Sequence, residues 1–356
     1  MAVTHSLDLL YGCALGDDPT IRSPGEAMPV IPMRARCVAL GTALPERRLT
    51  NADLAKLVDT TDEWIISRTG IRERRIAPPG SGVSPLALAA AQDCLARAGC
   101  TAADLDGIIV ATITGDRVMP AVANVLQHEL GAKRAWGFDL LNACNGFVAG
   151  LSTAACYIES GRAKRILVVG ADVMSSVIDY NDRNTCILFG DGAGAVLVEA
   201  GPIDGPGVLG FELHSDGGGG NDLAIPCTGS KGEAPDARKV VHQNGRVVFS
   251  HAVRRMAEVA ESCLKTLGLT GADVDLVVPH QANIRIIEST AERIGVPMDR
   301  VVVNIDRVGN TTAATIPLAL AQAQEDGRLK NGTRVLLVAF GGGFTWGACY
   351  LTWGRG

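Results

Sequence analysis

An internal repeat constrains the fold of this 356-residue chain more than any other feature. Seven positions of one apolar segment recur 169 positions later with the same residue types. They are Cys94, Leu95, Gly99, Thr101, Ala103, Asp104 and Asp106, which recur as Cys263, Leu264, Gly268, Thr270, Ala272, Asp273 and Asp275. The same displacement superposes the apolar run 165–169 on the run 334–338. Because self-similarity at a fixed period marks a repeated structural unit, we predict two halves with the same order of elements.

Within each half, helical stretches alternate with short apolar strands, as in βαβ units. In the first half, we expect helices at 85–98, 120–130 and 145–160, and strands at 108–113, 138–141 and 166–170. In the second half, we expect helices at 245–267, 283–294 and 312–325. Continuous apolar runs predict strands buried on both faces. The predicted fold class is α/β, with two mostly parallel sheets sandwiched by helices and the small apolar helix 147–156 buried between them.

Two segments lie outside this pattern. Residues 1–32 carry little periodicity, so we interpret them as an N-terminal extension or poorly ordered arm. The stretch 217–239 is rich in Gly and Pro, which favours a surface loop. The rest is predicted to divide into an N-terminal half, 33–204, and a C-terminal half, 205–356.

Charge and hydropathy argue against several classes of protein. A formal net charge of -5 disfavours nucleic-acid binding. No apolar run reaches the roughly 18 to 20 residues that cross a bilayer, and the segment 7–16 is a poor signal peptide, so we predict a cytoplasmic protein without membrane insertion. The ten cysteines form no Cys-x-x-Cys pair and the histidines are isolated. We therefore expect mostly reduced core cysteines and no metal site.

Cys144 lies where a predicted strand passes into the buried helix, with Gly146 close behind. A thiol at a helix N-terminus experiences the positive end of the macrodipole, which lowers reactive thiol pKa values to about 3.5 to 7.5. The alternative is an unreactive core cysteine. The turn predicts a nucleophile whose pKa is lowered.

Two polar residues of the second half could act with this cysteine. His280 ends the apolar run 277–279, at the strand edge where α/β sheets place their sites. Asn310 precedes a predicted helix and taken alone could be an N-cap. The repeat displacement carries Cys144 onto Ala313, so the Asn310 turn is the counterpart of the cysteine turn. Both turns are predicted to face one site.

Glycine-rich stretches support different interpretations. Residues 341–343 follow the strand 335–340, where glycines mark a tight bulge or let backbone N–H groups approach a ligand, as an oxyanion hole requires. The run 190–194 lacks the Gly-x-Gly-x-x-Gly spacing and precedes a strand, so it predicts no nucleotide-binding loop.

At these residues the chain resembles the β-ketoacyl-acyl carrier protein synthase III family, the initiating condensing enzymes of type II fatty acid synthesis. The resemblance extends from about Arg34 to Trp353. The motifs that carry it are 61–65 (TDEWI), 68–74 (RTGIRER), 143–147 (ACNGF), 189–195 (FGDGAGA), 279–283 (PHQAN), 309–311 (GNT) and 341–347 (GGGFTWG). It implies a thiolase-like duplicated fold in five layers and a decarboxylative Claisen condensation through an acyl-cysteine.

The resemblance also implies roles for individual residues. Cys144 would be the nucleophile, His280 and Asn310 would polarise the malonyl thioester carbonyl, and the N–H groups of Cys144 and Gly342 would form the oxyanion hole. The implied coenzyme A-binding residues are Thr60, Trp64, Arg68, Arg183 and Asn283. The implied acyl-pocket residues are Ile113 and Met119, with Met119 reaching into the partner subunit of a homodimer. The implied carrier-protein docking residues are Arg285, Arg246, Arg254 and Arg255.

The expected partners are acyl-CoA, malonyl-acyl carrier protein and a second copy of the chain, with no cofactor beyond the coenzyme A thioester substrate. Two alternatives stay open at this point. A secondary-metabolism relative would use the same residues with another acceptor, such as a β-keto acid or an amine. A catalytically silent scaffold would keep only the fold, although the intact Cys144, His280 and Asn310 set argues against it.

Overall fold

The computed structural model describes residues 33–226 and 239–355. These described residues form one compact unit. The predicted extension 1–32 and most of the predicted loop 217–239 lie outside the described residues. No helix of the described part of the chain is long and apolar enough to cross a membrane.

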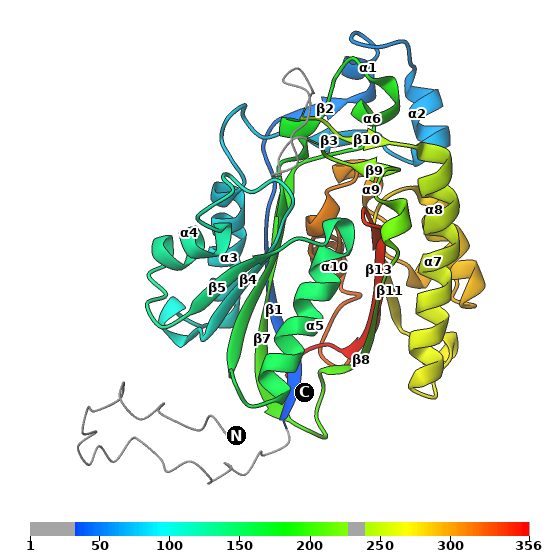
Figure 1. Ribbon diagram of the computed structural model, residues 1–356. Helices are drawn as coiled ribbons and strands as arrows, with labels where there is room; N and C mark the ends of the chain where they lie inside the picture. The colour runs from blue at the N-terminus through cyan, green and yellow to red at the C-terminus, as the bar shows by residue number, and fades with distance from the viewer. Residues whose placement is uncertain (1–32, 227–238, 356) are drawn as a thin grey trace, which may run out of the picture. The chain divides into compact units, whose positions relative to one another are not determined.

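Two sheets organise this unit (Figure 1). The first has five strands in the order β1 (Met33–Ala43), β7 (Gly192–Pro202), β6 (Arg165–Asp172), β4 (Gly107–Ala111) and β5 (Trp136–Leu140). The second has four strands in the order β11 (Leu276–Pro279), β12 (Arg334–Gly341), β13 (Thr345–Thr352) and β8 (Val208–Ser215). Their shared faces are almost wholly apolar, as the continuous apolar runs predicted.

The prediction of mostly parallel sheets is wrong in strand direction. β4 runs parallel to β5 and β6, and β11 runs parallel to β12. β7 runs antiparallel to both β1 and β6, and β13 runs antiparallel to β12 and β8. Burial on both faces produces a continuous apolar run in either direction, so the sequence pattern reports burial and not direction. The short connection between β12 and β13 also requires an antiparallel pair.

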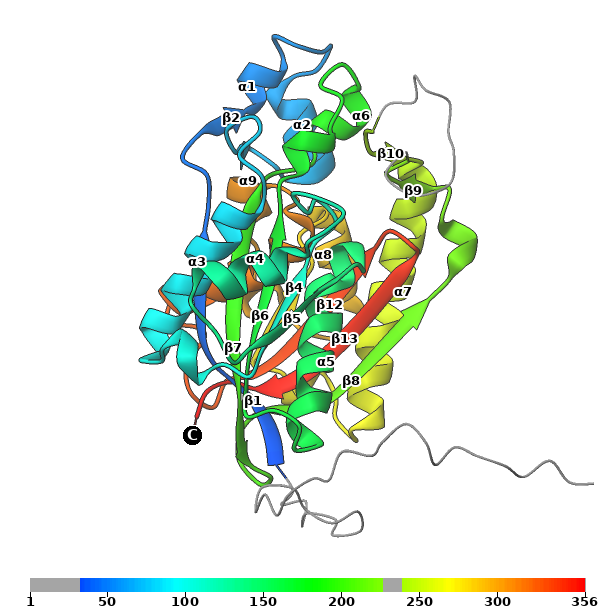
Figure 2. The same cartoon turned by 60° about the vertical axis from the view of Figure 1, so that its left-hand side comes forward.

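Helices complete a five-layer arrangement (Figures 1 and 2), which confirms the predicted thiolase-like architecture. The first sheet is covered on its outer face by α3 (Ser84–Ala98) and α4 (Val122–Glu129). Between the sheets lie α5 (Gly146–Glu159) and α10 (Thr315–Glu325). The outer face of the second sheet is covered by α7 (Gly245–Thr266) and α8 (Ile284–Arg293). Small residues along α5 let both sheets approach it closely.

The repeat is visible in local structure. Thr101 and Asp104 form a capping box at the short 3-10 helix η1 (Ala102–Asp104). Thr270 and Asp273 form the same box at η5 (Gly271–Asp273), 169 positions later. Each box leads into a buried parallel strand, β4 or β11. The two halves therefore share local turns as well as the order of their elements.

The remaining described elements are shorter, and several of them carry residues that line the rim of the site. They are β2 (Arg48–Thr50), α1 (Asn51–Leu54), α2 (Asp62–Thr69), β3 (Glu73–Arg75), η3 (Met174–Val177), α6 (Arg183–Cys186), η4 (Gly217–Gly219), β9 (Leu223–Ala224), β10 (His242–Gln243), η6 (Met298–Arg300) and α9 (Ile305–Val308). Two 3-10 turns, η2 (Ala143–Asn145) and η7 (Thr312–Ala314), precede α5 and α10. A small apolar cluster around Ile65, Ile71 and Ile305 holds the rim together.

Candidate active site

Cys144, His280 and Asn310 line one cavity of about 800 Å³. They come from three places: η2, the end of β11, and the turn that follows α9. All three side chains are buried. The fold thus brings together the residues that the sequence placed far apart, although the cavity alone does not establish their roles.

Two equivalent turns carry this cavity, the cysteine turn (residues 142–145) and the asparagine turn (residues 309–313). Ala143 has a φ of 47° and Thr312 a φ of 49°. Across the described residues these are the two non-glycine residues with positive φ, and they lie 169 positions apart. Such conformations cost about 1 to 3 kcal/mol and persist where the surroundings enforce them. The strain is therefore repeated at both turns of the site.

The backbone N–H of Cys144 is available to a ligand. No described residue accepts a hydrogen bond from this group or from the N–H of Gly342. Gly341 ends β12 against the cysteine turn, where a Cβ would lie 2.6 Å from the Cys144 nitrogen. Only glycine fits at this close approach. The open N–H groups support the predicted oxyanion hole.

The predicted lowering of the Cys144 pKa is wrong for the unliganded chain. Burial raises the pKa of this thiol to about 12, and the nearby negative charge of Asp172 acts in the same direction. The turn of η2 precedes α5, but the low-polarity surroundings disfavour the thiolate more than the helix N-terminus favours it. The thiol is thus protonated at neutral pH and must lose its proton when it reacts.

His280 is a neutral imidazole at physiological pH. Burial lowers its pKa to about 3. The backbone N–H of His280 donates to the Val338 carbonyl at 2.8 Å, which fixes the residue to β12. Its buried Nδ1 has no hydrogen-bond partner among the described residues. A neutral ring with free nitrogen atoms can both donate to a substrate oxygen and accept a proton.

Gln281, the residue after His280, connects the end of β11 to the segment that leads to Asn310. Gln281 Oε1 accepts hydrogen bonds from the N–H groups of Asn304 at 3.0 Å and Ile305 at 3.2 Å. These residues begin α9, the helix that leads to Asn310. The histidine and asparagine segments are therefore bonded to each other.

Asn310 is fixed in both backbone and side chain. Its N–H donates to the Leu188 carbonyl and its carbonyl accepts from the Gly190 N–H, both at 2.9 Å. The side-chain Oδ1 accepts a hydrogen bond from the N–H of Thr312 at 3.0 Å. With Oδ1 held in this way, the Nδ2 amide is left to donate to a ligand. Asn310 is not the N-cap of α10, which begins at Thr315.

A smaller apolar cavity of about 270 Å³ also reaches Cys144. Ile113 lines it, as predicted for the acyl pocket, and Gly342 and Thr312 line it as well. Further lining residues, which the sequence analysis missed, are Met174, Phe189, Leu223, Ile225 and Val241. They come from four separate segments, so no single stretch of sequence marks them. Met119 is not among them, because its side chain is 81% exposed.

The residues predicted to bind the nucleotide end of coenzyme A lie around Trp64, which lines the large cavity. The guanidinium groups of Arg183 and Arg68 lie over the Trp64 ring, at 5.3 and 5.9 Å from its centroid. Asn283 donates to the Arg68 carbonyl at 2.8 Å. Trp64, Arg68 and Asn283 line the cavity, whereas Thr60 and Arg183 are not among its lining residues. The free chain already stacks Arg183 on Trp64, so a purine would have to separate them.

The four predicted docking arginines differ in their surroundings. Arg285 and Arg246 line the large cavity, and Arg285 donates to the Ser67 carbonyl at 2.9 Å. Arg254 is exposed on α7. Arg255 pairs with Glu258 at 3.1 Å and lies over the Trp346 ring, so it is already engaged within the chain.

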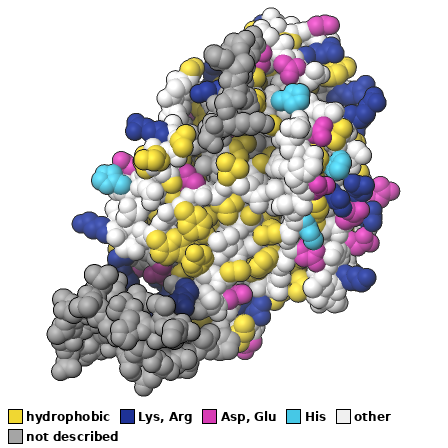
Figure 3. Space-filling model, viewed as in Figure 1, with side chains coloured by type: hydrophobic (Ala, Val, Ile, Leu, Met, Phe, Trp, Pro, Cys, Tyr) yellow, Lys and Arg dark blue, Asp and Glu magenta, His cyan; other side chains and the backbone are white. Residues whose placement is uncertain are grey.

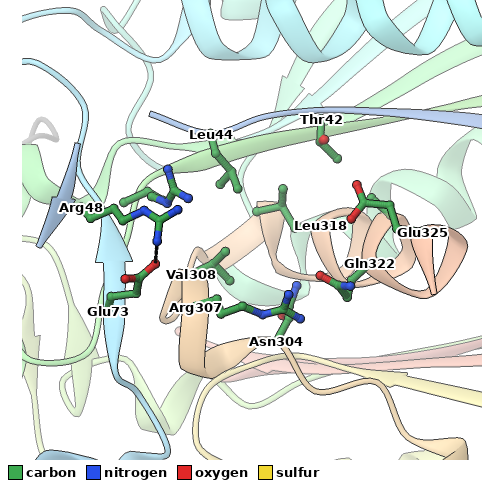
Figure 4. Close-up of a pocket in the computed structure, with 12 residues that line it drawn as sticks. Thr42, Leu44, Arg48, Glu73, Asn304, Arg307, Val308, Leu318, Gln322 and Glu325 are labelled. Atoms are coloured by element: carbon green, nitrogen blue, oxygen red, sulfur yellow. Dashed lines mark ion pairs between the residues drawn. The ribbon is translucent and has the colours of Figure 1, made fainter. Parts of the chain in front are cut away.

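A separate cavity of about 260 Å³ lies between β3, α9 and α10 (Figure 4). Its basic side chains have partners: Arg48 pairs with Glu73 at 3.2 Å, and Arg75 donates to the Pro45 carbonyl at 3.1 Å. None of the predicted site residues lines it. Across the described residues no cluster of His, Cys, Asp or Glu could hold a metal ion. We therefore assign the candidate site to the cavities that share Cys144.

Comparison with known proteins agrees with this assignment. Residues 138–217 match the family 3-oxoacyl-[acyl-carrier-protein (ACP)] synthase III, and residues 264–353 match its C-terminal domain. A beta-ketoacyl-[acyl-carrier-protein] synthase III of Koribacter versatilis (strain Ellin345) is 50% identical over 327 residues, covering 90% of this chain and 98% of the relative.

Solved structures show the same similarity. The synthase III of Thermus thermophilus is 44% identical with a TM-score of 0.85, covering 90% of this chain and 100% of that one. The synthase III of Aquifex aeolicus VF5 is 41% identical with a TM-score of 0.84 and the same coverage. Fold and sequence place the chain among the thiolase-fold condensing acyltransferases. Within that class, it belongs to the 3-oxoacyl-[acyl-carrier-protein] synthase III family.

Proposed function

We propose that the chain joins an acyl group from acyl-CoA to malonyl-acyl carrier protein, releasing coenzyme A and CO₂ and forming a β-ketoacyl-acyl carrier protein. This is the initiating condensation of fatty acid synthesis. The observation that carries the assignment is the shared lining: Cys144, His280 and Asn310 line one cavity, and Trp64 and Arg285 line it as well. An apolar branch of the same space ends beside Cys144 and suits the acyl chain.

In the first half-reaction, Cys144 Sγ attacks the acyl-CoA thioester after losing its proton. A bond forms between Sγ and the acyl carbon, and coenzyme A leaves as the thiol. The developing oxyanion is stabilised by the N–H groups of Cys144 and Gly342, which have no partner among the described residues. The raised thiol pKa makes the thiolate a strong nucleophile once it forms.

In the second half-reaction, the malonyl carboxylate leaves as CO₂ and its bonding electrons form an enolate. The enolate carbon attacks the acyl-Cys144 carbonyl, and Sγ leaves. His280 and the Asn310 Nδ2 amide donate hydrogen bonds to the thioester oxygen on which the enolate charge develops. Decarboxylation supplies the carbanion, so we propose that the reaction needs no cofactor beyond its thioester substrates.

The nucleotide of coenzyme A is proposed to bind between Trp64 and Arg183, with Arg68 and Thr60 beside it and Asn283 on the pantetheine arm. An indole face and a planar guanidinium suit a purine. The acidic carrier protein is proposed to dock on Arg285, Arg246 and Arg254. Arg255 is the weakest member of the predicted set because Glu258 already neutralises it.

A homodimer is proposed from the exposed apolar face over β5 and α5 (Figure 3). β5 is an edge strand, and Trp136 stacks on Phe138 with centroids 5.6 Å apart. Leu141 and Met119, which flank this edge, are each 81% exposed. Open edges with apolar surroundings are normally covered. Analytical ultracentrifugation should find that the wild type is a dimer and that the Phe138→Asp variant is a monomer. A monomeric wild type would reject the proposal.

The function is tested by intact-protein mass spectrometry with a panel of acyl-CoAs, together with CO₂ release from labelled malonyl-acyl carrier protein. Wild type should gain one acyl mass on Cys144 and form the β-ketoacyl product. Cys144→Ala should gain no acyl mass yet still release CO₂. An adduct in Cys144→Ala, or no adduct with any acyl-CoA in wild type, would overturn the assignment.

A further inference from the structure

Asp172 lies buried between the two turns of the site and has no place in the mechanism above. It is the last residue of β6 and is fully buried. Its Oδ1 accepts hydrogen bonds from Thr112 Oγ1 at 3.1 Å, the Ile113 N–H at 2.9 Å and Thr114 Oγ1 at 2.8 Å. A buried carboxylate with this many donors holds its surroundings in one arrangement.

The second carboxylate oxygen bonds the other half of the chain. Asp172 Oδ2 accepts hydrogen bonds from Thr312 Oγ1 and from the Ala313 N–H, the latter at 3.2 Å. These donors belong to the asparagine turn. All five contacts donate hydrogen bonds to the carboxylate. An ionised Asp172 can accept all five, whereas a protonated Asp172 has an O–H donor in place of one acceptor.

Thr312 connects this carboxylate to Asn310. The Thr312 residue has the unusual positive φ, and its N–H donates to Asn310 Oδ1. Its hydroxyl is the group that Asp172 holds. A change at Asp172 would therefore release the residue that fixes which way the Asn310 amide faces.

Comparison of the two halves strengthens this connection. The repeat displacement carries Asp172 onto Gly341, and both residues end their strands beside an active-site turn. Asp172 satisfies the N–H of Ala313, the counterpart of Cys144. Gly341 has no side chain and leaves the N–H of Cys144 open. The carboxylate is present at the turn whose N–H is structural and absent at the turn whose N–H would bind the oxyanion.

We infer that Asp172 is a positioning residue, which acts through Thr312 to direct the Asn310 Nδ2 amide toward the malonyl thioester oxygen. The inference rests on the proposed role of Asn310. Through its other oxygen, Asp172 holds the backbone of Ile113 at the acyl cavity. One carboxylate thus fixes the distance between the acyl-pocket wall and the asparagine turn.

Asp172→Asn is the direct test, because the amide keeps the shape but replaces one of the two acceptor oxygens with an NH₂ donor, which would then face the N–H of Ile113 or of Ala313. Decarboxylation of malonyl-acyl carrier protein should fall about 10- to 100-fold in kcat, the range expected for losing a buried charge-assisted hydrogen bond. The KM for acyl-CoA should stay within about twofold. A merely structural role would lower both half-reactions together.

A double-mutant cycle with Asn310→Ala separates the explanations. If Asp172 acts through Asn310, then Asp172→Asn should slow the Asn310→Ala variant by no more than about twofold. If the rate losses of Asp172→Asn and Asn310→Ala multiplied in the double variant, the inference would be overturned while the proposed function would stay intact. Normal decarboxylation by Asn310→Ala would overturn the proposed role of Asn310, and the inference with it.

Should Asp172→Asn fold poorly, a matched pair of threonine variants tests the same connection. Thr312→Val and Thr114→Val each remove one hydroxyl from the same carboxylate, on opposite sides. Thr312→Val should slow decarboxylation about tenfold, and Thr312→Ser should restore it, while Thr114→Val should stay within about twofold of wild type. Equal losses in the two valine variants would contradict the inference.

Discussion

The cysteine turn and the asparagine turn occupy equivalent positions in the two halves and share a positive φ at Ala143 and Thr312. They differ in what their backbone donors contact. The Cys144 N–H has no acceptor among the described residues, whereas the Ala313 N–H donates to Asp172. We propose that the first turn offers its backbone N–H to the substrate, whereas the second uses its backbone to orient the Asn310 side chain. One repeated backbone geometry can thus support two different uses, depending on the residue that ends the neighbouring strand, Gly341 or Asp172.

The largest expected effect comes from removing the side-chain donors at the asparagine side. His280→Ala and Asn310→Ala should each raise the activation free energy of decarboxylation by about 2.7 to 4 kcal/mol, because each removes one donor to the enolate oxygen. The decarboxylation rate should therefore fall roughly 100- to 1000-fold. Both variants should still form acyl-Cys144, with His280→Ala slower if the imidazole assists proton loss. Intact mass and CO₂ release measure the two steps. Normal decarboxylation by the double variant would contradict the assignment of decarboxylation to His280 and Asn310.

The next largest effect is expected from pH, which should change the rate of acylation at Cys144 but not the rate of decarboxylation. Burial raises the pKa of Cys144 to about 12 and lowers the pKa of His280 to about 3. Between about pH 6 and 8, the thiolate fraction therefore rises about tenfold per unit while His280 stays neutral. Single-turnover acylation should rise about 100-fold across this range. Decarboxylation by Cys144→Ala should stay nearly flat.

A pH-independent acylation rate would contradict that expectation. It would show that the proton passes from Cys144 to a group within the site instead of to solvent. His280→Ala provides the control, because its acylation should then become pH-dependent if His280 were the acceptor.

Trp64→Ala should affect only the step at the cysteine turn. Loss of one face of the purine site should raise the KM for acyl-CoA about tenfold. Decarboxylation of malonyl-acyl carrier protein should be unchanged, since that substrate carries no adenine. Arg48→Ala is a suitable control, because Arg48 is exposed and pairs with Glu73 away from the cavity. If the variant kept an unchanged KM for acyl-CoA but lost decarboxylation, Trp64 would act on malonyl-acyl carrier protein and not on acyl-CoA.

The smallest effect is expected at the acyl pocket. If Met119 of the partner subunit closes this pocket, Met119→Trp should lower kcat/KM for long acyl-CoAs relative to acetyl-CoA by about fivefold, below the roughly tenfold or more of a direct pocket contact. The neighbouring Val118→Trp is the matched control, because Val118 is 93% exposed. Identical chain-length profiles for the two variants would remove Met119 from the pocket.

Much of this fold could be predicted because the sequence repeats itself. The displacement that aligns Cys94 with Cys263 also gave the equivalence of Cys144 and Ala313, and the structure places both at the same kind of turn. Strand direction could not be predicted, since β6 and β12 are buried on both faces and each pairs with one parallel and one antiparallel neighbour. Apolar runs report the environment of a strand and not its partners.

The site was predictable only where a motif stood in one stretch. Cys144, His280 and Asn310 each lie in a recognisable turn, whereas Leu223 and Ile225 line the acyl cavity from a Gly- and Pro-rich region that predicted only a surface loop. Asp172 was missed because the end of an apolar strand gives no sign of five converging donors. The thiol pKa was misjudged because helix position is visible in sequence and depth of burial is not.

The contact between Gly341 and the cysteine turn has a consequence for biosynthesis. Cys144 is translated long before β12, yet its turn is completed by the end of that strand. A nascent chain that has folded only its first half would carry the cysteine without Gly342, His280 or Asn310. A chain that lacks the second half therefore carries Cys144 without the groups that we propose act with it, so incomplete chains should not become trapped as acyl-enzymes.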